Sequence, residues 1–132
     1  AVRSGVICAI ASHHQPHELD AKRNPFADTE PGISSIELQL PLALKLVEDG
    51  VFDLPTALAR LTHGPANAMR LNAGRLSVGA MADVVIFDPK GTTLAGETWY
   101  SKGRNCPFIG ETLPGRVHYS LVGGRITHRI DR

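Results

Sequence analysis

Three of the six histidines of this 132-residue chain lie within five positions, in the segment SHHQPH at residues 12–17. Imidazole nitrogens bind metals when neutral, donate hydrogen bonds when charged and exchange protons near neutral pH. The cluster can therefore serve metal-dependent or acid–base chemistry. It is equally compatible with loop histidines that hydrogen-bond the backbone. His63, His118 and His128 are scattered, and we expect them at the surface or at helix ends.

An apolar run leads into this cluster. Residues 6–12 (VICAIAS) are typical of a strand buried on both faces of a parallel sheet. Residues 13–35 are polar and contain several prolines, so we expect a long loop there. In α/β barrels the carboxyl ends of the strands carry the reactive groups. The histidines would then lie at such a reactive end.

Helices are expected after this loop. Residues 36–49 predict one that Pro41 must either begin or kink. Asp53 fits the N-cap of a second helix, and Gly64-Pro65 ends it and begins a third through Arg70. The buried stripe of the first helix would be Ile36, Leu40, Leu44 and Val47, and that of the second Leu54, Leu58 and Leu61.

Short β-type runs follow Gly74, at residues 75–78, 84–87, 117–122 and 125–127. Gly123-Gly124 predicts a tight hairpin, because paired glycines supply the positive φ angles of a type I′ turn. We therefore expect a small antiparallel β unit. The strand at residues 6–12 has no parallel partner in the chain, although buried backbone groups must be paired. The chain is accordingly expected to be a fragment, or one assembled piece, of a larger α/β protein.

Composition narrows the class of protein. The formal net charge is +1 without blocks of like charge, which gives no reason to expect a nucleic acid or an acidic membrane as partner. Cys8 and Cys106 are too far apart for a metal knuckle and suggest reduced thiols. No apolar stretch approaches the roughly 20 residues that span a bilayer, and no secretory signal begins the chain. We expect a soluble, cytoplasmic protein.

A set of short motifs runs along nearly the whole chain. They are IASHHQPH at 10–17, Pro25-Phe26, Glu30-Pro31-Gly32-Ile33, Glu37, Pro65-Ala66 before Leu71, Gly74-Arg75-Leu76, Gly79, ADVVIFDP at 82–89, NCPFIG at 105–110 and Gly115-Arg116-Val117. Together they resemble the carboxyl-terminal portion of class I dihydroorotases, in the amidohydrolase superfamily. The family's eighth-strand motif reads I-[AC]-[ST]-D-H-x-P-H, followed by P-F, a glycine-containing loop and G-x-E.

The resemblance implies an α/β fold in which residues 1–73 form the last part of a metal-dependent (β/α)8 TIM barrel. Residues 74–132 would form a segment of a small antiparallel β-sandwich. It also implies two metals, usually zinc, in the full-length proteins, and the interconversion of N-carbamoyl-L-aspartate and dihydroorotate in pyrimidine synthesis. By motif position, His17 is expected to help hold the substrate carboxylate, and Pro31-Gly32 to contact the pyrimidine ring. The alternative role of Pro31-Gly32 is a turn that caps the following helix.

The sequence departs from the family at His13, where the motif has its catalytic, metal-binding Asp. Histidine can bind zinc and move protons, but it is larger and brings no negative charge. The other metal ligands would lie upstream of Ala1, so we expect no cofactor and no activity for this chain alone. We therefore expect a non-catalytic homologue or subunit. The alternative is a segment of an active zinc-dependent dihydroorotase or related cyclic amidase.

Several partners follow from the resemblance. They are the remaining barrel segment of the same protein, aspartate transcarbamoylase, with which class I relatives and inactive homologues assemble, and further copies of the protein itself. A weaker alternative is a small β-rich binding module made of residues 75–132. Trp99 and Tyr100 could anchor an interface or pack within the β unit.

Overall fold

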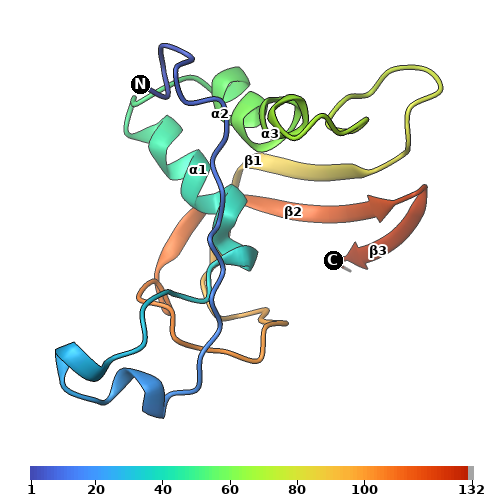
Figure 1. Cartoon of the computed structure of the whole chain (residues 1–132). Helices are drawn as coiled ribbons and strands as arrows, with labels where there is room; N and C mark the ends of the chain where they lie inside the picture. Colours follow the sequence, from blue (N-terminus) through green and yellow to red (C-terminus); the bar gives the residue numbers. More distant parts are fainter. Residues whose placement is uncertain (131–132) are drawn as a thin grey trace.

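A three-stranded antiparallel sheet forms the second half of the chain, in a computed structural model that describes residues 1–130. Its strands are β1 (Val84–Leu94), β2 (Thr112–Val122) and β3 (Arg125–Arg129), with β2 in the middle (Figure 1). β2 and β3 are joined by the predicted hairpin, in which Val122 pairs with Arg125. Gly123 and Gly124 have φ angles of +55° and +81°, which confirms the prediction of a turn with two positive φ angles.

β1 continues through Asp88-Pro89 and Gly91, where the sequence predicted its end. The pairing of β1 with β2 shifts register between Asp88 and Thr92, and this irregularity accommodates the proline. β1 is also an edge strand of the described sheet, so the missing N–H of Pro89 need not break a ladder on its open side. The strand is therefore longer than its apolar run suggests.

The predicted strand at residues 75–78 is wrong. These residues form no strand, and Leu76 and Val78 are 83% and 108% exposed. An apolar run becomes a strand only when a partner satisfies its backbone, and among residues 1–130 none does so here. The described part of the chain thus contributes one sheet of the expected β-sandwich.

The first helix is α1 (Gln39–Glu48), preceded by the short 3₁₀ turn η3 (Ile36–Leu38). Pro41 lies in the first turn of α1, where a missing N–H costs no intrahelical bond, so it belongs to the start of the helix rather than to a kink. Leu44 of the predicted stripe is buried, but Ile36 is 54% exposed. That part of the prediction is wrong, because the 3₁₀ turn changes the helical phase before α1 begins.

The next helices are α2 (Leu54–Leu61) and α3 (His63–Ala68). The Asp53 carboxylate accepts a hydrogen bond from Thr56 N–H at 3.0 Å, which confirms Asp53 as the N-cap of α2. The two helices separate at Thr62, which has a non-helical backbone conformation. Buried Gly64 lies so close to the backbone carbonyl of Cys8 that a side chain would overlap it.

The segment at residues 6–12 is not a regular strand in this chain. It runs in an extended course past α1, as the dark blue trace shows in Figure 1, and Val6 is 81% exposed. Its backbone is held by scattered bonds: Ile10 N–H donates to Arg60 O, and the Gln39 side chain donates to Ile10 O. A parallel strand needs neighbouring strands on both sides, and residues 1–130 supply none.

The main buried cluster lies where the first half of the chain meets the long connection between β1 and β2. Leu38, Ala95 and Leu113 form it, and Trp99 and Phe108 pack against it. Trp99 therefore packs within the molecule, whereas its neighbour Tyr100 is 73% exposed. We name residues 95–111 the support loop. The buried cluster holds this loop against Leu38.

The described residues combine helices with an antiparallel sheet, and the helices pack on that sheet. α1 lies against β2, where Leu44 occupies the space that a side chain at Gly115 would need. The division at residues 73 and 74 stays a prediction. None of the helices within residues 1–130 has the length and apolar character needed to cross a bilayer.

Candidate functional site

His13 lies at the carboxyl end of the extended segment and is exposed. Its φ angle is +46°, in the left-handed region that residues with a side chain rarely adopt. Such strain is found mainly where the surrounding structure imposes it, and it clusters at functional sites. The backbone therefore directs the His13 side chain differently from a residue in a regular strand.

His14 is fixed by the structure, although the sequence assigned it no role. Its Nδ1 atom accepts hydrogen bonds from Ser35 N–H at 3.1 Å and Ile36 N–H at 3.2 Å. Nδ1 therefore carries no proton, and the neutral ring has its hydrogen on Nε2, which lies 3.3 Å from Ser101 Oγ. The His14 ring thus caps the start of η3, and its Nδ1 atom is not available to bind a metal.

His17, Pro31 and Gly32 are brought together, as the resemblance implied. The His17 Nε2–H donates to Pro31 O at 2.9 Å. Gly32 has a φ angle of +99°, and a side chain there would overlap Gln15. The two segments are also joined by Gln15 N–H, which donates to Ile33 O at 2.9 Å. The pair of segments therefore forms one unit, although substrate binding by it stays a prediction.

Asn105 of the support loop joins the same two segments. It is 8% exposed, and its side-chain oxygen accepts from His17 N–H at 2.8 Å and from Ser34 Oγ–H at 2.6 Å. Its amide nitrogen donates to Gln15 O at 3.0 Å and to Gly32 O at 3.2 Å. The sequence had marked Asn105 only as a family match. Its role depends on contacts across some 90 residues, which spacing cannot reveal.

Glu37 belongs to the motifs of the family resemblance, but the sequence predicts no role for it. Its Oε1 atom accepts from Ser101 N–H at 2.6 Å, whereas Oε2 is buried and has no hydrogen-bond partner within residues 1–130. A buried carboxylate oxygen without a hydrogen-bond partner is costly. The Glu37–Ser101 bond also ties η3 to the support loop, close to His14.

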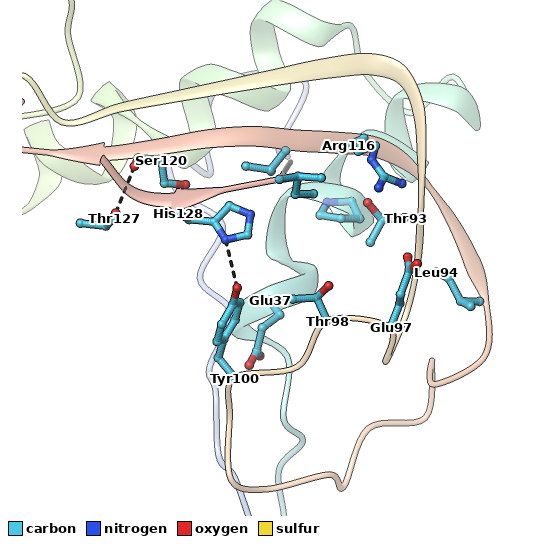
Figure 2. Close-up of a pocket in the computed structure, with 13 residues that line it drawn as sticks. Glu37, Thr93, Leu94, Glu97, Thr98, Tyr100, Arg116, Ser120, Thr127 and His128 are labelled. Atoms are coloured by element: carbon cyan, nitrogen blue, oxygen red, sulfur yellow. Dashed lines mark hydrogen bonds between the residues drawn. The ribbon is translucent and has the colours of Figure 1, made fainter. Parts of the chain in front are cut away.

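A cavity of about 610 Å³ lies beside Glu37, between α1, the sheet and the support loop. Figure 2 shows Tyr100 and His128 on one side of it, joined by a hydrogen bond of 3.2 Å between Tyr100 Oη and His128 Nδ1. Neither His13 nor the His17–Pro31–Gly32 unit lines this cavity. It is therefore separate from the site that the sequence predicted.

The residues of this chain do not fit a metal centre by themselves. Within residues 1–130, no three His, Cys, Asp or Glu side chains lie where they could hold one ion together. His14 Nδ1 and His17 Nε2 are occupied by backbone partners. His13 could add a single ligand to a centre completed by other groups.

A protein-family model described as "Amidohydrolase family" matches residues 45–128, which is more than half of the chain. The chain belongs to the amidohydrolase family. This confirms the family that the motifs indicated, and it accounts for the combination of an extended segment, helices and an antiparallel sheet.

Curated relatives of this amidohydrolase carry dihydroorotase names. A "Dihydroorotase-like protein" of Pseudomonas aeruginosa is 70% identical over 128 residues, covering 97% of this chain. A "Dihydroorotase" of Geotalea daltonii is 41% identical over 96% of the chain. In both cases the chain spans 30% of the relative's own length.

Solved structures of hydantoinases share the fold of this amidohydrolase chain. D-hydantoinase from a Bacillus sp. is 27% identical with a TM-score of 0.85, and L-hydantoinase from Arthrobacter aurescens is 24% identical with a TM-score of 0.86. Each match covers 97% of this chain and 30% of the other. The similarity includes the helical half, which favours a barrel fragment over a β-module of residues 75–132.

Proposed function

We propose that this chain forms the substrate-facing part of a dihydroorotase-type protein that binds dihydroorotate without turning it over. The relatives named dihydroorotase-like at 70% identity and dihydroorotase at 41% support the substrate class. The grouping of His17, Pro31 and Gly32 supports the place of binding. The proposed loss of turnover rests on one observation: His13 stands where the family motif has its Asp.

The geometry suits a ligand with one carboxylate and a cyclic amide edge. With Nε2–H bonded to Pro31 O, the His17 ring is held in one orientation and Nδ1 is left for a ligand. When the ring is doubly protonated, Nδ1–H can donate a charge-assisted bond to a carboxylate. Gly32 N–H can donate to a ring carbonyl, and the carbonyls of Pro31 and Gly32, which already accept from His17 and Asn105, each keep a second lone pair for a ring N–H. Dihydroorotate carries both features.

His13 explains why binding would not lead to hydrolysis. Opening the ring requires a group that takes a proton from water and returns it to the leaving nitrogen, and the family has a carboxylate at this position. Imidazole is larger than a carboxylate and supplies no negative charge. A left-handed backbone at His13 further restricts where its nitrogens can lie.

The test is turnover of dihydroorotate and N-carbamoyl-L-aspartate by the protein at its full natural length, with the variants His13→Asp and His13→Asn. We expect no turnover from the wild type or from His13→Asn, which has the shape of Asp but no charge. His13→Asp should raise turnover at least about 100-fold above background if the rest of the site is intact. Turnover by the wild type would contradict the proposal.

A second candidate is an active, zinc-dependent dihydroorotase in which His13 replaces the carboxylate. Relatives of 41% and 44% identity that are named dihydroorotase favour it. Wild-type turnover that is lost with a chelator and restored by zinc would establish this candidate. Loss of turnover in His13→Ala would assign the proton transfer to the imidazole.

A non-catalytic protein of this type would act as a subunit, and we propose aspartate transcarbamoylase as its partner, in the cytoplasm. Its support is the family resemblance. Analytical ultracentrifugation of the full-length protein with aspartate transcarbamoylase from the same cells would show a complex. Two separate species at micromolar concentrations would contradict the assembly.

A further inference from the structure

The support loop contacts the predicted binding unit chiefly through the buried side chain of Asn105. Asn105 uses both acceptor positions of its oxygen, for His17 N–H and Ser34 Oγ–H, and both amide hydrogens, for Gln15 O and Gly32 O. Its own carbonyl accepts from Ser34 N–H at 3.2 Å. The hydrogen-bonding capacity of the side-chain amide is thus filled by the two segments that carry His17 and Gly32.

We propose that Asn105 is the positioning residue that sets the distance between His17 and Pro31-Gly32 and so determines affinity for the ring-and-carboxylate ligand; this inference rests on the proposed function. Two segments bind a shared ligand more tightly when their separation is fixed beforehand, because less order has to be gained on binding. The side chain of Asn105 is the one group in the described chain that bonds to His17 and Gly32 together.

The support loop is itself firmly held, so Asn105 can transmit a fixed position. Gly103 is buried and lies so close to Pro16 and His17 N that a side chain would meet them at 2.6 and 2.8 Å. Trp99 Nε1–H donates to Gly103 O at 2.8 Å and packs on the cluster of Leu38, Ala95 and Leu113. These contacts therefore fix the position of His17 relative to the buried cluster.

Asparagine is the residue type that this position requires. Aspartate has the same shape and keeps both acceptor bonds, but it would place carboxylate oxygen against the carbonyls of Gln15 and Gly32. Alanine removes all four bonds and leaves polar backbone groups unpaired in a buried place. Asn105→Asp therefore keeps the two bonds that the side-chain oxygen accepts, from His17 and Ser34, and loses the two that the amide donates, whereas Asn105→Ala loses all four.

The experiment measures dihydroorotate affinity by calorimetry, and hydrogen–deuterium exchange without ligand, in the protein at its full natural length. The variants are Asn105→Ala and Asn105→Asp, with Asn24→Ala as the matched control, since Asn24 lies exposed in the loop between the two segments. We expect both Asn105 variants to weaken binding about tenfold or more, because ordering the two segments then becomes part of the cost of binding. Asn24→Ala should bind as the wild type does.

Hydrogen–deuterium exchange distinguishes a positioning role from a general effect on stability. In Asn105→Ala, faster exchange should be confined to residues 15–17 and 32–35, whereas Asn105→Asp should keep the protection of His17 N–H. Unchanged affinity, or loss of protection throughout the molecule in both variants, would overturn the inference. If the wild type itself does not bind dihydroorotate, the proposed function fails. The confined exchange pattern would then still support the positioning role, and its absence would overturn it.

Discussion

Single residues near the site adopt backbone conformations that their surroundings impose. His13 has a positive φ angle despite its side chain, and Gly32 has a φ angle of +99° against the side chain of Gln15. His14 is held by two backbone N–H groups, which selects one tautomer. The backbone at residues 12–17 and 31–35 is therefore specified by local chemistry.

Gly32→Ala should destabilise the protein more than Gly110→Ala does. Both glycines have positive φ angles, and strain of that kind costs about 1–2 kcal/mol for a residue with a side chain. Gly110 has open space around it, whereas a side chain at Gly32 overlaps Gln15. Urea unfolding of the two variants measures the difference. Equal losses would show that the Gln15 contact is absent.

The resemblance predicted which residues would meet, and the structure brings His17, Pro31 and Gly32 together. It did not predict Asn105 or the Glu37–Ser101 bond as parts of the unit. Both contacts join residues more than 60 positions apart, and hydrophobic periodicity carries no information about such pairs. Local chemistry was readable from the sequence, and long-range hydrogen bonding was not.

At the scale of elements, helix starts and turns follow their local signals. Asp53 caps α2, Pro41 lies in the first turn of α1, and Gly123-Gly124 form the hairpin. The failures, at residues 6–12 and 75–78, are segments that find no strand partner within residues 1–130. A strand depends on its neighbours, whereas a cap or a turn depends on a few adjacent residues.

The Asp53 cap should make the stability of α2 depend on pH. Hydrogen bonding to the Thr56 side chain and then to Thr56 N–H lowers the pKa of the Asp53 carboxyl below its ordinary value of 3.8. The stabilisation is therefore present above about pH 4 and is lost as the pH falls through the folded-state pKa.

Asn caps helices as well as Asp does but does not titrate, so Asp53→Asn is the matched control. Thermal unfolding followed by circular dichroism at pH 7 and pH 3 should show a larger acid-induced loss for the wild type than for Asp53→Asn. An equal loss in both proteins would mean that the cap does not contribute.

At the scale of the whole molecule, several large apolar side chains of the described residues are almost fully exposed. Val6, Phe26, Leu76 and Val78 are each more than four-fifths exposed. The chain spans 30% of the length of its curated relatives, and large exposed apolar patches mark surfaces that other parts of a protein cover. We therefore expect the remaining barrel segment to cover these residues.

The 132 residues expressed alone should bind a hydrophobic dye such as ANS and associate at micromolar concentrations. The full-length protein, in which we expect the barrel segment to cover Leu76 and Val78, should do neither. Fluorescence and light scattering measure the two effects. A monodisperse fragment without dye binding would show that its apolar surface needs no cover.

The central claim is that His17 and Pro31-Gly32 form a binding unit for dihydroorotate. A crystal structure of the full-length protein soaked with dihydroorotate tests it most directly. The account predicts the ligand carboxylate within hydrogen-bond distance of His17 and the ring against Pro31-Gly32, with His13 facing the ring amide. A ligand bound elsewhere, or His17 turned away from an occupied site, would contradict the account.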